Sequence, residues 1–178
     1  TLGIIGMGRI GQGIAKRGLG FGMNVIYHNR KRLSESDEKA CGARYVDKET
    51  LLREADHVVL VVPYSAESHH LIGAKEIALM KSTATLVNIA RGGIVDDAAL
   101  AEALKAKKIF AAGLDVYEGE PKVHPELLKL SNVVLAPHIA SATEKTRRAM
   151  INLAVRNLRA ALAGEKPPSL INTELWKK

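Results

Sequence analysis

The sequence feature that most constrains the fold is a glycine pattern near the start of the chain. Gly6, Gly8 and Gly11 stand between an apolar run and a helical pattern. The run is Leu2 to Ile5, and the helix is expected over residues 11–19. A G-x-G-x-x-G between a strand and a helix is typical of dinucleotide-binding domains. Gly6 would allow the tight turn, Gly8 the approach of a pyrophosphate, and Gly11 close packing of the helix on the sheet. Because ordinary turns match this pattern too, the prediction depends on the rest of the chain.

Composition predicts one domain in a reducing environment. The chain has 178 residues, 47% hydrophobic and 25% charged, which is enough for one full core. Cys41 is the single cysteine, so no internal disulfide forms and a cytoplasmic location is expected. No apolar run has the length of a membrane span, and we expect no leader and no membrane partner. The net charge of +7 is scattered and aromatic residues make up 4%, so we expect no nucleic-acid partner, although a nucleic-acid-binding module stays open as a third function class.

Short apolar runs alternate with helical patterns along the chain. Runs of Val, Ile and Leu without alternation indicate strands buried on both faces, as in a parallel sheet covered by helices. We therefore expect an α/β fold with a doubly wound parallel sheet, the Rossmann arrangement. Further strands are expected over residues 24–27, 57–62, 85–89, 109–114 and 133–136, and further helices over residues 48–54, 74–80, 96–106 and 142–162.

The C-terminal part of the chain is expected to hold one long helix and a tail. The helix carries an apolar stripe made of Met150, Leu153, Ala154, Leu158, Ala161 and Leu162. Gly164 and the Pro167-Pro168 pair end it. We expect residues 1–164 to form the dinucleotide-binding domain and residues 165–178 to form the tail.

The end of the second expected strand indicates which dinucleotide binds. An acidic residue there binds the ribose of NAD, whereas an Arg accommodates the 2′-phosphate of NADP. Asn29, Arg30 and Lys31 follow the strand, and no carboxylate appears before Glu35. An Arg can bind a phosphate through two charge-assisted hydrogen bonds. We expect NADP(H) to be preferred and NAD(H) to be possible, with Lys31 or Arg32 in support. A solvated basic turn is the alternative.

Polar side chains at three other strand ends indicate a reactive site. Arg91 follows one expected strand, and His138 follows the last. Asp115 ends the strand between them, with Glu120 five residues further on. Ligands of open parallel sheets bind beyond the carboxyl ends of the strands. Reduction of a 2-oxo acid needs a cation for the carboxylate, which Arg91 provides, and an acid for the alkoxide, which His138 beside Glu120 provides. Each residue alone is as readily a surface ion pair or a structural polar group, but their joint placement favours a site.

Together these motifs resemble the D-2-hydroxyacid dehydrogenase family. The resemblance covers essentially the whole chain and rests on Gly6-Met-Gly-Arg-Ile-Gly11, the Pro63 turn, Asn88-Ile-Ala-Arg-Gly92 with Val95-Asp96, Gly113-Leu-Asp115, Glu120-Pro121 and Pro137-His-Ile-Ala-Ser-Ala142-Thr. The sequence is most similar to the glyoxylate/hydroxypyruvate reductases and the 2-ketogluconate reductases, which tend to favour NADPH. The resemblance implies an oxidoreductase that reduces a small-molecule 2-oxo acid to the D-2-hydroxy acid. It also implies a homodimer formed through this domain.

The resemblance implies a role for each matched residue. Arg91, Glu120 and His138 would be the catalytic residues, with His138 the proton donor. Contacts to the cofactor would come from Gly6, Gly8, Arg9, Ile10, Gly11, Asn29, Arg30, Lys31, Pro63, Ala90, Asp115 and Ser141. Within this set Arg9 and Ile10 would touch the pyrophosphate. Asp115 would lie by the nicotinamide carboxamide, whose pocket Ala90 and Ser141 would line.

One departure from the family bears on activity. The resemblance implies a separate substrate domain built mostly from residues that precede the glycine strand, whereas this sequence begins on that strand. We therefore expect an isolated cofactor domain that binds NADPH and turns over very slowly or not at all. A non-catalytic dinucleotide sensor or corepressor on the same fold is the alternative function.

We expect no metal site in this chain. His69 and His70 are adjacent, so in regular structure their side chains would point different ways. No third ligand lies near them at the spacing of a metal site.

Overall fold

The computed structural model describes residues 1–176 and divides the chain into two compact units. The first unit is Thr1–Pro137, and the second begins at His138. The chain thus divides earlier than the expected functional boundary after residue 164, which stays a prediction. None of the helices formed by residues 1–176 combines the length and the apolar character that a membrane crossing requires.

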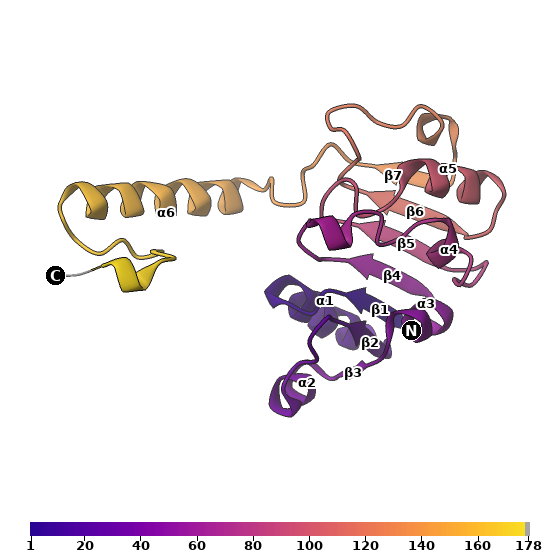
Figure 1. Ribbon diagram of the computed structural model, residues 1–178, viewed down its shortest axis with the longest axis horizontal. Coiled ribbons are helices and arrows are strands. Elements are labelled where there is room, and N and C mark those ends of the chain that lie inside the picture. The colour runs from indigo at the N-terminus through magenta and orange to yellow at the C-terminus, as the bar shows by residue number, and fades with distance from the viewer. Residues whose placement is uncertain (177–178) are drawn as a thin grey trace. The chain divides into compact units, whose positions relative to one another are not determined.

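A parallel sheet of seven strands forms the centre of the first unit (Figure 1). The strands are β1 (Leu2–Ile5), β2 (Val25–His28), β3 (Ala43–Tyr45), β4 (His57–Leu60), β5 (Thr85–Asn88), β6 (Ala111–Leu114) and β7 (Val133–Leu135). Their order is β3-β2-β1-β4-β5-β6-β7, so the chain crosses back over β1 between β3 and β4. The predicted doubly wound α/β fold is confirmed. The crossing places the glycine turn after β1 at the point where such sheets bind ligands.

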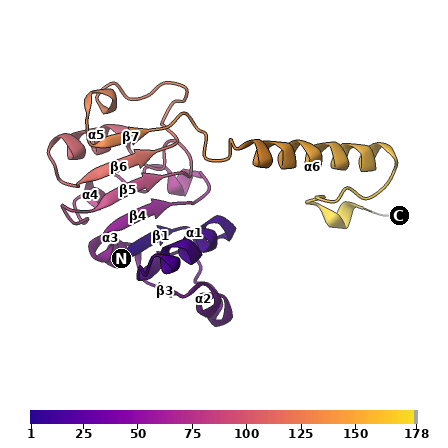
Figure 2. The same cartoon turned by 180° about the vertical axis from the view of Figure 1, so that it is seen from behind.

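Helices cover both faces of the sheet. They are α1 (Arg9–Gly20), α2 (Glu35–Cys41), α3 (Lys48–Glu54), α4 (Ala74–Ile77) and α5 (Asp97–Lys105). One cluster of buried side chains includes Ala15 of α1 and Cys41 of α2, and a second includes Leu51 of α3, Ile77 of α4 and Leu100 of α5. Figures 1 and 2, which view the sheet from opposite sides, accordingly show α1 and α5 on opposite faces.

One α-helix and one strand of the first unit were not predicted. Helix α2 has the sequence ESDEKAC, which lacks an apolar period, and only Cys41 is buried. It forms because the Ser34 hydroxyl accepts a hydrogen bond from the backbone N–H of Asp37 and three acidic residues stand in its first turn. Strand β3 follows directly, with Gly42 between them at a φ of +59°. It has only three residues, so its apolar pattern is too short to recognise.

The second unit contains the long helix that the sequence predicts. Helix α6 (Glu144–Leu162) begins at the Thr143 cap, whose hydroxyl accepts from the backbone N–H of Thr146. No α6 residue is buried, and the predicted stripe is exposed, with Met150 at 56% and Leu158 at 60%. The other regular element described in this unit is the single turn η3 (Thr173–Leu175), which is too short to cover a helix of this length.

Candidate dinucleotide site

The glycine turn after β1 is held by close backbone contacts. Gly6 has a φ of +107°, and a Cβ there would lie 2.7 Å from the Val61 carbonyl oxygen. A Cβ on Gly11 would collide with the Gly6 carbonyl oxygen. A Cβ on Gly8, by contrast, would meet no atom within 4 Å. Gly6 and Gly11 therefore serve the fold, while Gly8 leaves an open face beside the backbone.

The beginning of helix α1 is suited to an anion. Its N-cap is Gly8, which provides no side-chain cap, and its first turn contains no acidic residue. The backbone N–H groups of a first turn lack partners within the helix and lie at the positive end of the helix dipole. A phosphate is the ligand that such a terminus binds most readily.

Two adjoining clefts run along the carboxyl ends of the strands. The first has a volume of about 650 Å³ and the second about 450 Å³. Val61, Val62 and Pro63, which follow β4, line both clefts. Ile10 lines the first and Gly8 the second, so the start of α1 stands where the clefts meet. Two compartments joined at an anion-binding helix end match the two halves of a dinucleotide joined by its pyrophosphate.

The second cleft contains the polar residues that follow β2. Asn29, Arg30 and Lys31 line it, and so does Glu67, which the sequence did not indicate. The Arg30 guanidinium lies 3.2 Å from the Glu67 carboxylate, and their side chains are 84% and 75% exposed. Ion pairs this exposed contribute little free energy, so Arg30 is able to exchange Glu67 for a phosphate.

Arg32, expected as a second support for a phosphate, is engaged elsewhere. Its Nε and a terminal nitrogen donate to the two carboxylate oxygens of Glu38 at 2.8 and 2.7 Å. The Tyr27 hydroxyl donates to the same carboxylate. Arg32, and then Tyr27, hold the pKa of Glu38 at about 2. Arg32 therefore anchors α2, and Arg30 and Lys31 remain as the basic residues of the cleft.

Arg91 lines the first cleft on a turn fixed by the buried side chain of Asn88. The Asn88 Oδ1 accepts from the backbone N–H of Ala90 at 3.0 Å, and its Nδ2 donates to the Arg91 carbonyl at 3.2 Å. Asn88 is 1% exposed, so these bonds are shielded from water. Sequence reasoning gave Asn88 no role, although a polar residue at the end of an apolar strand is a usable signal. A Cβ on Gly92 would collide with the Tyr117 carbonyl, so this turn touches the loop that carries Glu120.

The loop after β6 that carries Glu120 is fixed by hydrogen bonds to other residues of the first unit. The Glu120 Oε1 accepts from the backbone N–H of Tyr117 at 2.9 Å. The carboxylate of Asp97, which is 4% exposed, accepts from the backbone N–H of Glu118 at 3.0 Å. Burial raises the pKa of the Asp97 carboxyl and that of the Tyr117 hydroxyl. The Tyr117 hydroxyl also lies 2.6 Å from the Ala136 carbonyl oxygen, which ties the loop to the end of β7.

The structure places the other predicted site residues as follows. Pro63 lines both clefts, and Ile10 and Ala90 line the first. Asp115 is 7% exposed at the end of β6, and its backbone N–H donates to the Asn88 carbonyl oxygen. Arg9 is exposed at the start of α1 and is not among the residues that line the two clefts. His138, at a φ of +54°, and Ser141 belong to the second unit, and their roles stay predictions.

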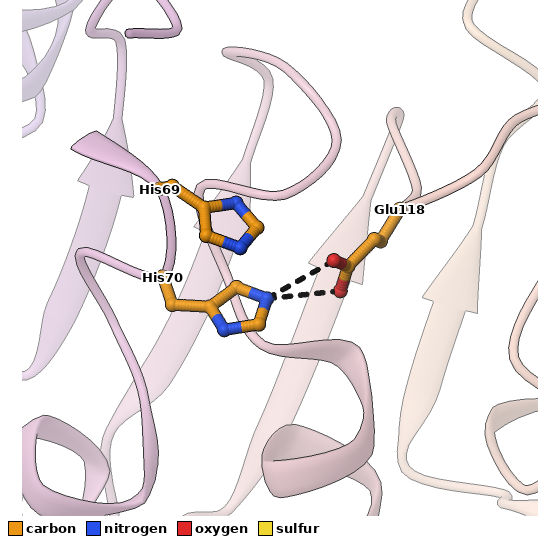
Figure 3. Close-up of side chains that lie close together, drawn as sticks. All are labelled: His69, His70 and Glu118. Atoms are coloured by element: carbon orange, nitrogen blue, oxygen red, sulfur yellow. Dashed lines mark hydrogen bonds and ion pairs between the residues drawn. The ribbon is translucent and has the colours of Figure 1, made fainter. Parts of the chain in front are cut away.

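The two adjacent histidines are not in regular structure, and a third polar group lies beside them (Figure 3), while the expected absence of a metal stays a prediction. The rings of His69 and His70 stack with 3.9 Å between their centroids. They share one side because His70 adopts a left-handed backbone with a φ of +49°, which regular structure excludes. Glu118, 48 residues away along the chain, supplies a third group whose carboxylate lies 3.1 Å from the His70 Nε2. Such a distant partner gives no local spacing signal.

Known proteins match this chain over most of its length. A family model described as the D-isomer specific 2-hydroxyacid dehydrogenase, NAD binding domain, matches residues 1–140. Glyoxylate reductase of Thermococcus litoralis is 54% identical over 175 residues, which are 98% of this chain and 53% of that protein. The chain spans about half the length of the curated relatives it matches.

Solved structures of related enzymes have the same fold as this chain. A glyoxylate reductase from Paecilomyes thermophila superposes with a TM-score of 0.88 at 42% identity, covering 97% of this chain and 52% of that one. An NADPH-dependent glyoxylate/hydroxypyruvate reductase from Sinorhizobium meliloti, in complex with NADP and malonate, gives 0.85 at 38% identity, with 92% and 50% covered.

Proposed function

Since this chain belongs to the D-isomer specific 2-hydroxyacid dehydrogenase family through its NAD-binding domain, we propose that it is the cofactor-binding half of an NADPH-dependent 2-oxo acid reductase. The substrate would be glyoxylate, hydroxypyruvate or a similar acid, reduced to the D-2-hydroxy acid. The observation that carries the proposal is the pair of clefts that meet at the uncapped start of α1, with Arg91 in one and Arg30 in the other.

The residues of the chain fit a dinucleotide. The open face beside Gly8 and the uncapped first turn would hold the pyrophosphate. The second cleft, with Asn29, Arg30 and Lys31, would hold the adenosine half. The first cleft would hold the nicotinamide, which supplies the hydride when bound.

Three side chains would carry out the remaining chemistry. Arg91 would bind the carboxylate of the 2-oxo acid and polarise its carbonyl. His138 would donate the proton that the forming alkoxide requires, and Glu120 would orient the imidazole. Asn88 would position Arg91 through its two buried hydrogen bonds to the turn.

The residues after β2 support the proposed preference for NADPH over NADH. Arg30 would leave its exposed pair with Glu67 for the 2′-phosphate, where the charge-assisted bonds are stronger. Lys31 lines the same cleft, and the residues that follow β2 add no acid before Glu35. The Sinorhizobium meliloti reductase, which is NADPH-dependent, supports this assignment. NADH would bind more weakly through the groups that both cofactors share.

The proposal also covers the substrate domain, the oligomeric state and the location of the whole enzyme. The relatives carry about as much sequence outside the matched region as within it. We propose that a substrate domain of that kind is needed for full turnover, and that this chain alone reacts slowly. We further propose a homodimer formed through this domain and a cytoplasmic location, which the single cysteine supports.

A single-turnover experiment tests the reductase assignment. NADPH is mixed with excess chain and glyoxylate, and the loss of its near-ultraviolet absorbance is followed. The expected result is slow oxidation that depends on glyoxylate and disappears in Arg91→Ala, while NADPH binding is kept. If NADPH binds and glyoxylate-dependent oxidation is measurable but equal in both proteins, the proposed role of Arg91 in the reaction is wrong.

A further inference from the structure

Two histidines and a glutamate form a cluster beside the first cleft (Figure 3). The cluster consists of His69, His70 and Glu118, and one donor atom from each lies within 4.8 Å of the other two. The His70 Nε2 is 3.1 Å from both carboxylate oxygens of Glu118. The His69 ring stacks on that of His70. The reaction proposed above assigns no step to any of these three side chains.

The backbone around the cluster is fixed on both sides. The backbone N–H of His70 donates to the Gly93 carbonyl oxygen at 2.7 Å. Gly93 has a φ of +77°, and a Cβ there would lie 3.3 Å from the His69 ring, so glycine leaves room for it. The N–H of Glu118 is bound to the buried Asp97 carboxylate. The three donors are therefore carried by anchored turns.

We propose that His69, His70 and Glu118 bind a divalent first-row transition cation, with Zn²⁺ as the representative ion. Two imidazoles and one carboxylate, with positions left for water, are a donor set that Zn²⁺ accepts. Mg²⁺ and Ca²⁺ prefer oxygen donors alone, so the nitrogens select against them. The site would bind Zn²⁺, Co²⁺ or Ni²⁺ and discriminate against Mg²⁺.

The distances require only local adjustment. Zn²⁺ bonds to nitrogen and oxygen at about 2.0–2.2 Å, so tetrahedral donors lie roughly 3.4 Å apart. The His70–Glu118 pair is already at 3.1 Å. The His69 ring must turn out of the stack, because an imidazole donates in the plane of its ring. His69 is exposed, and this rotation would cost it the stack on His70.

Each histidine has an oxygen near its Nδ1 in the structure. The His70 Nδ1 lies 3.9 Å from the Asp96 carboxylate, on the side of the ring away from Glu118. The His69 Nδ1 lies 3.1 Å from the Tyr64 hydroxyl. Each Nδ1 can carry its proton toward an oxygen, which leaves Nε2 as the ligand atom. Metal-binding histidines are commonly held this way.

The local charge also favours a cation. Asp96 and Glu118 face the two ring nitrogens of His70, and the Asp97 carboxylate accepts from the backbone N–H of Glu118. Among residues 1–176 none of the three carboxylates has a Lys or Arg nitrogen within 4.0 Å, although the chain carries a net charge of +7. A divalent ion bound there would offset part of this negative charge.

Occupation of the site would affect the neighbouring cleft. His69 and Glu118 line the first cleft together with Arg91. A cation bound there would lie at the edge of the space assigned to the nicotinamide and would hinder its use. This consequence rests on the proposed function, whereas the metal site does not.

Calorimetric titration of the untagged chain with Zn²⁺, without any dinucleotide, tests the proposal. The expected result is one ion per chain with a micromolar Kd that excess Mg²⁺ does not alter. His69→Gln, His70→Gln and Glu118→Gln should each weaken binding by at least about tenfold, since even loss of an outer partner commonly costs about 10–100-fold. His57→Gln is the matched control, because His57 is exposed and bonded to Thr85. Co²⁺ should give the visible absorption of a low-symmetry site in the wild type and in His57→Gln.

Two results would overturn the site. One is Zn²⁺ binding no tighter than millimolar, which would mean that His70 and Glu118 form an ordinary ion pair. The other is binding that the three variants leave unchanged while their circular dichroism shows a native fold. Failure of this site would leave NADPH binding unaffected, so the two proposals can be judged separately.

Discussion

The Asn29 side-chain oxygen accepts a 2.6 Å hydrogen bond from the backbone N–H of Met7. This bond joins the end of β2, where the cofactor would be distinguished, to the glycine turn, where its phosphates would rest. Asn29→Asp keeps the acceptor and adds a negative charge. We expect its Kd for NADPH to rise by at least about tenfold and that for NADH to change little, because a carboxylate repels the 2′-phosphate. Asn29→Ala removes the acceptor and should weaken both cofactors alike. Equal losses in Asn29→Asp would contradict this role.

The Glu67 carboxylate and the proposed 2′-phosphate would compete for the guanidinium of Arg30. Arg30→Ala should weaken NADPH by about 10–100-fold, the range expected for hydrogen bonds to a charged group, and leave NADH nearly unchanged. Glu67→Gln removes the competing carboxylate of an exposed pair and should tighten NADPH about two- to fivefold. Fluorescence titration of wild type and both variants with NADPH and NADH measures the six dissociation constants. An Arg30→Ala protein that binds NADPH as tightly as the wild type would remove Arg30 from the site.

Alanine variants of Gly8 and Gly11 distinguish an effect on cofactor binding from an effect on folding. A Cβ on Gly8 meets no protein atom within 4 Å, so Gly8→Ala should fold with a loss of no more than about 1 kcal/mol. The added methyl group would occupy the pyrophosphate position, and the affinity for NADPH should fall at least about tenfold. A Cβ on Gly11 collides with the Gly6 carbonyl, so Gly11→Ala should cost about 1–3 kcal/mol or more. Urea unfolding together with NADPH titration distinguishes the two effects. Normal binding by Gly8→Ala would place the phosphates elsewhere.

Asp97 holds the Glu120 loop through the Glu118 backbone N–H. Asp97→Ala leaves that buried donor unpaired and should cost about 1–3 kcal/mol. Asp97→Asn keeps an acceptor without the charge. Burial raises the pKa of Asp97 in the folded state, so its contribution to stability is complete below the pKa of the unfolded chain and is lost as pH rises. The stability of Asp97→Asn relative to wild type should therefore increase as pH rises above the ordinary aspartate pKa of 3.8. A constant difference in urea midpoints over this range would contradict the raised pKa.

Glu38 makes stability depend on pH in the opposite direction. Its pKa falls from an ordinary 4.5 to about 2 in the folded state, first because of Arg32 and then Tyr27. The stabilisation is thus present above the unfolded value and is lost as pH falls toward the folded one. Wild type should lose stability more steeply than Glu38→Gln between about pH 4.5 and pH 2. Thermal unfolding of both proteins across that window checks this, and parallel curves would exclude the network as the cause.

The sequence predicted the parts of the fold that depend on apolar runs and glycines. Strand β1 and helix α3 could be predicted because their buried positions require apolar residues. The turn at Gly6 could be predicted because its positive φ favours glycine. Helix α2 and strand β3 depend instead on a cap and on short edge pairing, which leave little periodic signal.

Some residues of the candidate site could likewise be predicted from the sequence, and others could not. Arg30 and Arg91 could be predicted because strand ends of a parallel sheet are known ligand positions. Glu67 and Glu118 could not be predicted, because each contacts a residue far away in the sequence. Glu67 pairs with Arg30, and Glu118 pairs with His70. The stacking of His69 on His70 depends on one left-handed residue, which no residue pattern around it indicates.

Calorimetric titration of the chain with NADPH and NADH tests most directly whether the two clefts form one site for a 2′-phosphorylated dinucleotide. We expect one NADPH per chain, with a Kd at least about tenfold below that of NADH, since the 2′-phosphate adds charge-assisted bonds to Arg30. Binding of neither cofactor would contradict the dinucleotide site. Tighter binding of NADH would contradict the assignment of Arg30.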